Sequence, residues 1–166
     1  MIILGIDPGT AITGFAVIKK TKDHHEKPKV IDFGCIVTDK SDSPGERLHI
    51  IHSQITKIIE RHHPAIMSVE SLYFFKNLKT VMPVSQAKGI ILLAAAQKNI
   101  PVQEFTPLQV KMTVVGYGRA EKKQVQAMTE QLLDLSSFDL KDKNRKKDDA
   151  ADALGIALCA SLKYFI

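Results

Sequence analysis

Acidic residues at three separate places in the chain are the groups whose types and spacing best suit catalysis. Asp7 ends the first apolar run, Glu70 ends a later short apolar run, and Asp148, Asp149 and Asp152 lie together near the C-terminus. Carboxylates that converge repel one another and raise one another's pKa values, so such a set makes sense mainly as a site for a hard cation such as Mg²⁺. Two such ions about 3.5–4 Å apart can bind the attacking and leaving oxygens of a phosphodiester.

Each acidic position also has a plain structural interpretation. Asp7 precedes a Pro-Gly pair, where an Asp often serves only as a turn residue bonded to its own backbone. Acids in the first turn of a helix stabilise its dipole by about 0.3–1 kcal/mol each, which would explain the C-terminal acids without any function. Helical spacing places both Asp149/Asp152 and Asp148/Asp152 on one face, so spacing permits a pair without choosing its members.

The elements that must position these acids are indicated by apolar periodicity and by helix caps. Apolar runs predict strands, Ser43-Pro44-Gly45-Glu46 is typical of a helix start, and Gly116-Tyr117-Gly118 predicts a helix break. In order, we expect strands at 2–6, 13–18 and 30–38, a helix at 43–63, a strand at 65–69, a helix at 80–98 with Pro83 in its first turn, a strand at 102–105, and helices at 106–115, 120–135 and from 148 towards 164.

This order of elements predicts an α/β fold with a mixed five-stranded sheet and helices on both faces. The first three strands are expected to pair antiparallel. If the strands that end at Asp7 and Glu70 are parallel neighbours, their carboxyl ends lie together at the edge of the sheet where sites of α/β proteins form. The C-terminal Asp pair would then complete a set of four carboxylates.

Composition sets limits on the class of protein. The 166 residues are 45% hydrophobic and carry a net charge of +5 with a pI near 9.2, which suggests a polyanionic partner. Length and composition fit one domain, residues 1–166. No apolar run approaches the roughly 20 residues needed to span a bilayer, and the N-terminus has no signal-peptide pattern. We therefore expect a cytoplasmic protein with no membrane partner.

Several short motifs together resemble one family, the RuvC-type Holliday-junction resolvases, over nearly the whole chain. The motifs are Gly5-Ile6-Asp7-Pro8-Gly9 with Thr13-Gly14, Glu70 with Lys76-Asn77, Gln109-Val110-Lys111 with Thr113-Val114-Val115-Gly116, Ala120-Glu121-Lys122, and Asp149-Ala150-Ala151-Asp152-Ala153-Leu154. Each is weak alone, and their order makes the set specific. The resemblance implies an RNase H-like fold and a homodimeric, structure-selective DNA endonuclease that nicks two opposed strands of a four-way junction.

The resemblance also assigns roles to the acids. Asp7, Glu70, Asp149 and Asp152 match the family's catalytic and metal-binding acids, which favours Asp149 over Asp148, and Asp148 becomes an extra acid that could change the local metal affinity. The implied cofactor is Mg²⁺, two ions per site with Asp7 bridging and Mn²⁺ as a substitute. The implied chemistry is hydrolysis to 5′-phosphate and 3′-hydroxyl ends.

Residues that contact DNA follow from the same resemblance. Lys111 and Lys122 match basic residues placed near the DNA backbone, whereas solvated helix lysines are the ordinary interpretation of the two. Tyr73 stands where the family carries an aromatic that stacks on an unpaired base, an interaction worth about 1–3 kcal/mol, and a core aromatic is the alternative. Lys76, a few residues later, belongs to the same expected DNA surface.

Partners expected from the resemblance are a four-way DNA junction, a second copy of the chain and a branch-migration helicase complex. A junction with near two-fold symmetry suits a C₂ dimer with two identical sites. The candidate interface is the helix expected at 80–98, because residues 90–96 are apolar on nearly every side. Burial of this helix in the interior of a single chain would explain the same pattern.

Three other functions compete with a junction nuclease. ATPases of the actin and sugar-kinase type share the Gly-Ile-Asp-x-Gly-Thr start, but they need two lobes and a second phosphate loop, and they do not require the late Asp149/Asp152 pair. A small RNA-processing nuclease of the same fold and a non-catalytic junction-binding module are the others. Tyr73, Lys111 and Lys122 argue against the former, and the complete acidic set argues against the latter.

Overall fold

A single five-stranded sheet organises the protein, with strand order β3-β2-β1-β4-β5. The computed structural model describes residues 1–21, 23, 26–71, 78–138 and 148–163. The elements are β1 (Ile2–Asp7), β2 (Ile12–Lys19), β3 (Lys29–Val37), α1 (Pro44–His62), β4 (Ile66–Glu70), α2 (Leu78–Gln97), β5 (Val102–Phe105), α3 (Pro107–Val115), α4 (Lys122–Leu132) and α5 (Asp148–Lys163). Their order confirms the predicted α/β fold with a mixed sheet.

The sheet is mixed because its two halves are connected differently. Strands β1, β2 and β3 form an antiparallel meander, as predicted. Strand β4 follows α1 and pairs parallel with β1 in the register Ile6↔Val69, and β5 follows α2 and pairs parallel with β4. Helical crossovers of this kind are what parallel pairing requires. The carboxyl ends of β1 and β4 therefore lie side by side.

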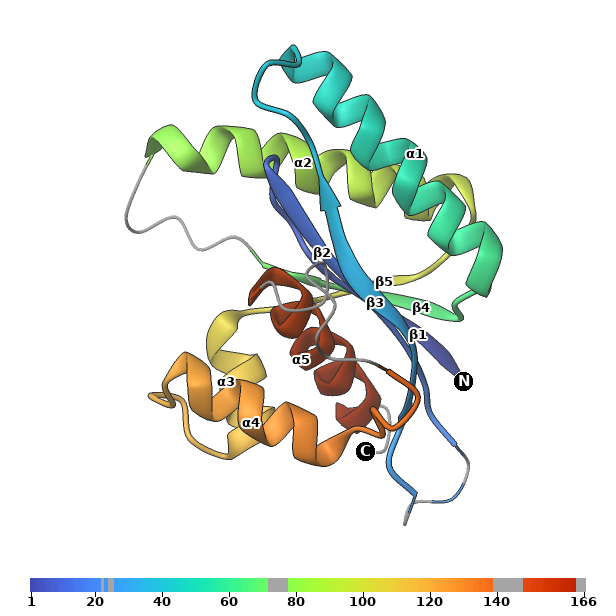
Figure 1. The fold of residues 1–166 in the computed structure, drawn as a ribbon, viewed down its shortest axis with the longest axis vertical. Coiled ribbons are helices and arrows are strands. Elements are labelled where there is room, and N and C mark those ends of the chain that lie inside the picture. Colours follow the sequence, from blue (N-terminus) through green and yellow to red (C-terminus); the bar gives the residue numbers. More distant parts are fainter. Residues whose placement is uncertain (22, 24–25, 72–77, 139–147, 164–166) are drawn as a thin grey trace.

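Helices cover both faces of the sheet (Figure 1), α1 and α2 on one face and α3, α4 and α5 on the other. The first face buries one cluster that includes Leu4 and Ile6 of β1 with Ile51, Ile55 and Ile91 of the helices. The second face buries another cluster in which α5 lies centrally, and α5 contacts every strand of the sheet. Of the helices, α5 is the one whose first turn holds Asp148 and Asp149.

Alternation of side chains along β1 decides which way Asp7 points. Ile3 packs in the cluster beneath α5, whereas Leu4 and Ile6 pack in the cluster beneath α1 and α2. Since successive side chains of a strand point to opposite faces, Gly5 and Asp7 share the α5 face with Ile3.

The same alternation operates in β4. Ile66 packs beneath α5, whereas Met67 and Val69 pack beneath α1 and α2. Ser68 and Glu70 consequently point to the α5 face. Both strand-end acids thus lie on the face that carries the C-terminal acids.

Helix ends follow the predicted caps. Ser43 and Glu46 form a capping box at α1, and Thr106 and Gln109 form another at α3. His63 ends α1 and Gly116 ends α3, both in the left-handed conformation. These local signals depend on residues close in sequence, which is why they could be predicted.

Two predicted helix features were wrong. Helix α4 begins at Lys122 and ends at Leu132, not at Leu135, because the backbone of Asp134 bonds to that of Val30 and Pro28 beside β3. Helix α2 begins earlier than predicted, at Leu78, so Pro83 lies inside the helix and beyond its first turn. A proline there removes one backbone hydrogen bond.

No helix within the described residues combines the length and apolarity that crossing a membrane would require. Tyr73 and Lys76, two of the expected DNA contacts, lie outside the described residues.

Candidate active site

Asp7 and Glu70 occupy corresponding positions at the ends of two parallel neighbours. Ile6 and Val69 are the last residues that pair between β1 and β4, and Asp7 and Glu70 come directly after them. Both acids are half-buried. Asp7 pairs across the β1–β2 ladder with Gly14, and the turn between these strands is held by a 2.6 Å hydrogen bond that Thr13 donates to the Gly9 carbonyl. The sheet therefore fixes both carboxylates on rigid backbone, as the sequence predicted.

Helix α5 reaches Asp7 because two glycines let it approach the sheet. A Cβ atom on Gly14 would lie 1.9 Å from the Asp149 carbonyl oxygen, and one on Gly5 would lie 2.4 Å from the Ala153 carbonyl oxygen. A side chain at either position would push the helix away. Gly5 and Gly14 thus place Asp149 and Asp152 beside Asp7, a role that the sequence analysis missed although strand glycines are a known signal of close backbone approach.

Ser68 makes a second contact between the sheet and α5. Its side chain is fully buried, and its hydroxyl lies 3.3 Å from the Ile156 carbonyl oxygen and 3.4 Å from that of Leu4. A small polar residue at this position provides a hydrogen-bond donor at the centre of the layer.

The acids are close enough to change one another's ionisation. Burial, followed by the charges of Glu70, Asp152 and Asp149, raises the pKa of Asp7 to about 8. Burial and the charge of Asp152 raise the pKa of Glu70 to about 7, and burial raises the pKa of Asp152 as well. We call Asp7, Glu70, Asp149 and Asp152 the carboxylate cluster, in which the charges of the other three act on Asp7.

Lys122, the first residue of α4, contributes a cation to this cluster. Its ammonium donates a 2.7 Å hydrogen bond to Asp152 Oδ2 and lies 3.5 Å from Asp148 Oδ2. Its charge also acts to lower the pKa of Asp7 and of Glu70. Lys122 was expected near DNA from its motif, whereas its ion pairs with Asp148 and Asp152 were not predicted.

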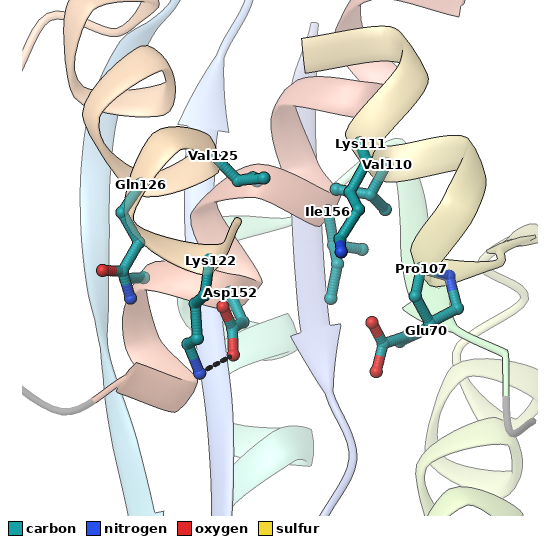
Figure 2. Close-up of a pocket in the computed structure, with 11 residues that line it drawn as sticks. Glu70, Pro107, Val110, Lys111, Lys122, Val125, Gln126, Asp152 and Ile156 are labelled. Atoms are coloured by element: carbon teal, nitrogen blue, oxygen red, sulfur yellow. Dashed lines mark hydrogen bonds and ion pairs between the residues drawn. The ribbon is translucent and has the colours of Figure 1, made fainter. Parts of the chain in front are cut away.

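A pocket of about 260 Å³ opens beside the cluster between α3, α4 and α5. Figure 2 shows Glu70 across the pocket from the ion pair of Lys122 and Asp152. Lys111 of α3 lines the same pocket, so both predicted backbone-contacting lysines lie next to predicted catalytic acids. The lining also has an apolar part, which includes Val110, Val125 and Ile156.

The donor set fits a hard divalent cation, since Mg²⁺ and Mn²⁺ prefer carboxylate oxygens. Burial first, and then the charges of neighbouring carboxylates, raise the pKa values of Asp7 and Glu70, and a bound cation would offset both effects. Within the described part of the chain, no three His, Cys, Asp or Glu side chains are already grouped as a metal would hold them.

Comparison with known proteins identifies the family. A family profile described as "Crossover junction endodeoxyribonuclease RuvC" matches residues 3–160 of the chain. The chain belongs to the RuvC family. RuvC relatives from Fusobacterium nucleatum subsp. nucleatum and Halothermothrix orenii are each 47% identical to it, over 158 residues (95% of this chain, 78% of the relative) and 164 residues (99% and 94%) respectively.

A solved RuvC structure has the same fold. Thermus thermophilus RuvC in complex with Holliday junction substrate matches the chain with a TM-score of 0.87 at 28% identity, covering 99% of this chain and 94% of that one. The RNase H-like mixed sheet predicted from the motif resemblance is thereby confirmed. Asp148 lies directly before Asp149, the first acid of the pair that the motif assigns to the site.

Proposed function

We propose that the chain is a metal-dependent, structure-selective endonuclease that resolves four-way DNA junctions by paired symmetric nicks in opposed strands. The observation that carries the proposal is the convergence of the carboxylate cluster at the shared end of β1, β4 and α5. Membership in the RuvC family supports it, as does the likeness to a RuvC solved with Holliday junction substrate.

The carboxylate cluster would hold Mg²⁺, or Mn²⁺ in its place, with two ions per site bound by Asp7, Glu70, Asp149 and Asp152. When bound, such ions supply an activated water for attack on phosphorus and charge stabilisation for the departing 3′ oxygen. Asp7 and Glu70 fix the position of this chemistry because they stand on adjacent strands. The products would carry 5′-phosphate and 3′-hydroxyl ends.

The lysines beside the cluster would orient the strand that is cut. Lys111 and Lys122 both line the pocket next to Glu70 and Asp152, where their ammonium groups can meet phosphate oxygens on either side of the scissile bond. Tyr73 and Lys76 complete this proposal from sequence alone, Tyr73 by stacking on an unpaired base at the crossover.

Homodimer formation through α2 is part of the same proposal. Ala87, Ile91 and Ala94 of α2 are buried against the sheet, so interior packing explains one side of the helix. Met82 and Leu93 remain 65% and 46% exposed on the outer side. An apolar outer face suits a two-fold contact between copies, which would present two identical sites to opposed strands.

Two further elements of the proposal concern cellular context. A nuclease that cuts four-way junctions acts where chromosomal DNA is recombined, so we place the protein in the cytoplasm. A branch-migration helicase complex is the partner that would deliver junctions to it. Enrichment of a junction-moving ATPase on the immobilised protein, dependent on junction DNA, would be the supporting result.

Cleavage of synthetic DNA tests the central proposal. A labelled four-way junction and a matched linear duplex are incubated with the protein, with and without Mg²⁺, beside the variants Asp7→Asn and Asp42→Asn. Paired nicks in the junction alone, requiring Mg²⁺ and Asp7 but not the distant Asp42, are expected. Junction binding without cleavage by the wild type would instead indicate a non-catalytic binding module, and efficient cutting by Asp7→Asn would refute the assigned site.

Asp7→Asn should still bind the junction. Removing a carboxylate lowers repulsion towards phosphate and removes no contact that attracts DNA. Binding by this variant is therefore the evidence that its loss of cleavage is chemical.

A further inference from the structure

A lysine ammonium already lies within the acidic site. Lys122 Nζ is 2.7 Å from Asp152 Oδ2, the contact drawn in Figure 2. It also lies 3.5 Å from Asp148 Oδ2, so the ammonium links two acids of α5 to the start of α4. The side chains of Lys122 and Asp152 are 49% and 32% exposed. The pair is therefore partly shielded from water yet open enough to separate.

The charge of Lys122 reaches beyond the residue to which it bonds. It acts to lower the pKa values of both Asp7 and Glu70, against the burial and mutual repulsion that raise them. Burial of Lys122 itself acts to lower its own pKa, but the hydrogen bond and charge of Asp152, with the charge of Asp148, raise it overall. The ammonium thus offsets part of the negative charge of the carboxylate cluster, as a metal cation would, but with a single positive charge.

We propose that Lys122 is an exchangeable counter-ion of the carboxylate cluster, which occupies Asp152 until a divalent cation displaces it, and that Asp148 is a positioning residue that retains Lys122 there. The inference rests on the proposed metal-dependent function. An ammonium and a divalent cation that share one carboxylate repel each other. Metal binding at Asp152 therefore requires Lys122 to leave.

The released lysine has a second use in the same site. Lysine is a compact charge on a flexible stem, so the ammonium can swing from a carboxylate to a nearby phosphate oxygen without movement of α4. Metal binding and capture of the scissile strand would then be coupled, because the ion that enters frees the cation that binds DNA. If Lys122 served only to contact DNA, its substitution would not change the metal affinity measured in the absence of DNA.

Calorimetric titration with Mn²⁺, in the absence of DNA, tests the exchange directly. Lys122→Met removes the competing charge and keeps the length of the side chain, so it should bind Mn²⁺ at least about fivefold more tightly than the wild type. Lys123→Met is the matched control, because Lys123 is exposed on the same turn and makes no ion pair within the described residues. It should change affinity by less than about twofold.

Asp148 is tested in a double-mutant cycle with Lys122. With Lys122 present, Asp148→Asn loosens the lysine, and this gain offsets the loss of a negative charge near the ion. In the Lys122→Met background there is no lysine to loosen, so Asp148→Asn only removes a negative charge near the ion. Asp148→Asn should therefore weaken Mn²⁺ binding at least about twofold more in that background than in the wild type. Equal weakening in both backgrounds would refute the positioning role.

A measurement on the unaltered protein avoids any effect of substitution on folding. The ¹⁵N signal of the Lys122 ammonium should be visible and slow to exchange with water in EDTA, and it should lose that protection on saturation with Mg²⁺. An ammonium that stays protected with Mg²⁺ bound, or unchanged Mn²⁺ affinity in Lys122→Met, would overturn the exchange. Absence of Mn²⁺ binding by the wild type would overturn the proposed metal site itself, and the exchange with it.

Discussion

The backbone of Gly14 lies directly against the carbonyl of Asp149. A Cβ on Gly14 would be 1.9 Å from that oxygen, far inside van der Waals contact. Because Gly14 pairs with Asp7 across the β1–β2 ladder, this contact sets how far the acid on the strand lies from the acid on the helix. The geometry of the carboxylate cluster thus depends on a residue that has no side chain.

Gly14→Ala should damage both stability and catalysis. The added methyl group meets backbone, which cannot rotate away, so α5 must shift, at a cost of about 1–3 kcal/mol of unfolding free energy. A displacement of about 1 Å in Asp149 should lower junction cleavage by about 100-fold. Urea unfolding and single-turnover cleavage measure the two effects. Gly45→Ala is the control, because a Cβ there meets nothing within 4 Å, and near-normal values for Gly14→Ala would contradict this account of the site.

The raised pKa of Asp7 predicts a pH-dependent stability without metal. The folded protein keeps a proton on Asp7 up to about pH 8, whereas the unfolded chain loses it near pH 4, so the free energy of unfolding falls as pH rises between these values. Asp7→Asn removes this penalty. It should stabilise the protein in EDTA by about 2–3 kcal/mol near pH 8 and by less than about 1 kcal/mol near pH 5, after allowance for partial exposure.

Urea unfolding at several pH values provides the measurement, with Asp42→Asn as a control. Asp42 lies in the turn before α1 and is not a member of the carboxylate cluster, so its substitution controls for the loss of a carboxylate elsewhere in the chain. A stabilisation by Asp7→Asn that did not change with pH would mean that Asp7 is ionised in the folded protein throughout the range.

Local features of this fold were predictable because their causes are local. Ser43 and Glu46 form a capping box through contacts between residues three apart, and Asp7 and Glu70 end their strands where apolar runs stop. The two acids were expected to lie together only if those strands were parallel neighbours, and the register Ile6↔Val69 shows that they are. These two facts are enough to bring Asp7 and Glu70 together, whereas Asp149 and Asp152 also need the close approach of α5 at Gly5 and Gly14.

Features that join distant elements were not predictable from periodicity. Every residue of 2–6 is apolar or glycine, so β1 gives no sign of which face Asp7 shares. The end of α4 at Leu132 depends on a backbone bridge from Asp134 to β3. The pairing of Lys122 with Asp152 depends on how α4 packs on α5. Each of these relations is set by packing between residues far apart in the chain.

Lys111 should contribute to DNA binding through charge. It lines the pocket beside Glu70, where a phosphate would pass. In the Asp7→Asn background, which should bind without cutting, Lys111→Gln is expected to weaken junction binding and to reduce the slope of log affinity against log salt by about 1. Lys57→Gln is the control, because it removes the same charge from an exposed position on α1 across the sheet. Equal slopes for both variants would show that Lys111 makes no phosphate contact.

The outer face of α2 should hold two copies together. Leu93 is 46% exposed in the single chain, so Leu93→Glu leaves the core intact, and the free energy of unfolding of the chain itself should change by less than about 0.5 kcal/mol. In a dimer the two-fold axis brings the substituted helices together, and the buried charges should separate the subunits.

Sedimentation equilibrium should show a dimer for the wild type and a monomer for Leu93→Glu. The control Met112→Glu, at a residue 51% exposed on α3 across the sheet, should stay dimeric. The monomer should nick one strand of a junction without the paired second cut. A dimer that survives Leu93→Glu would place the interface on another surface.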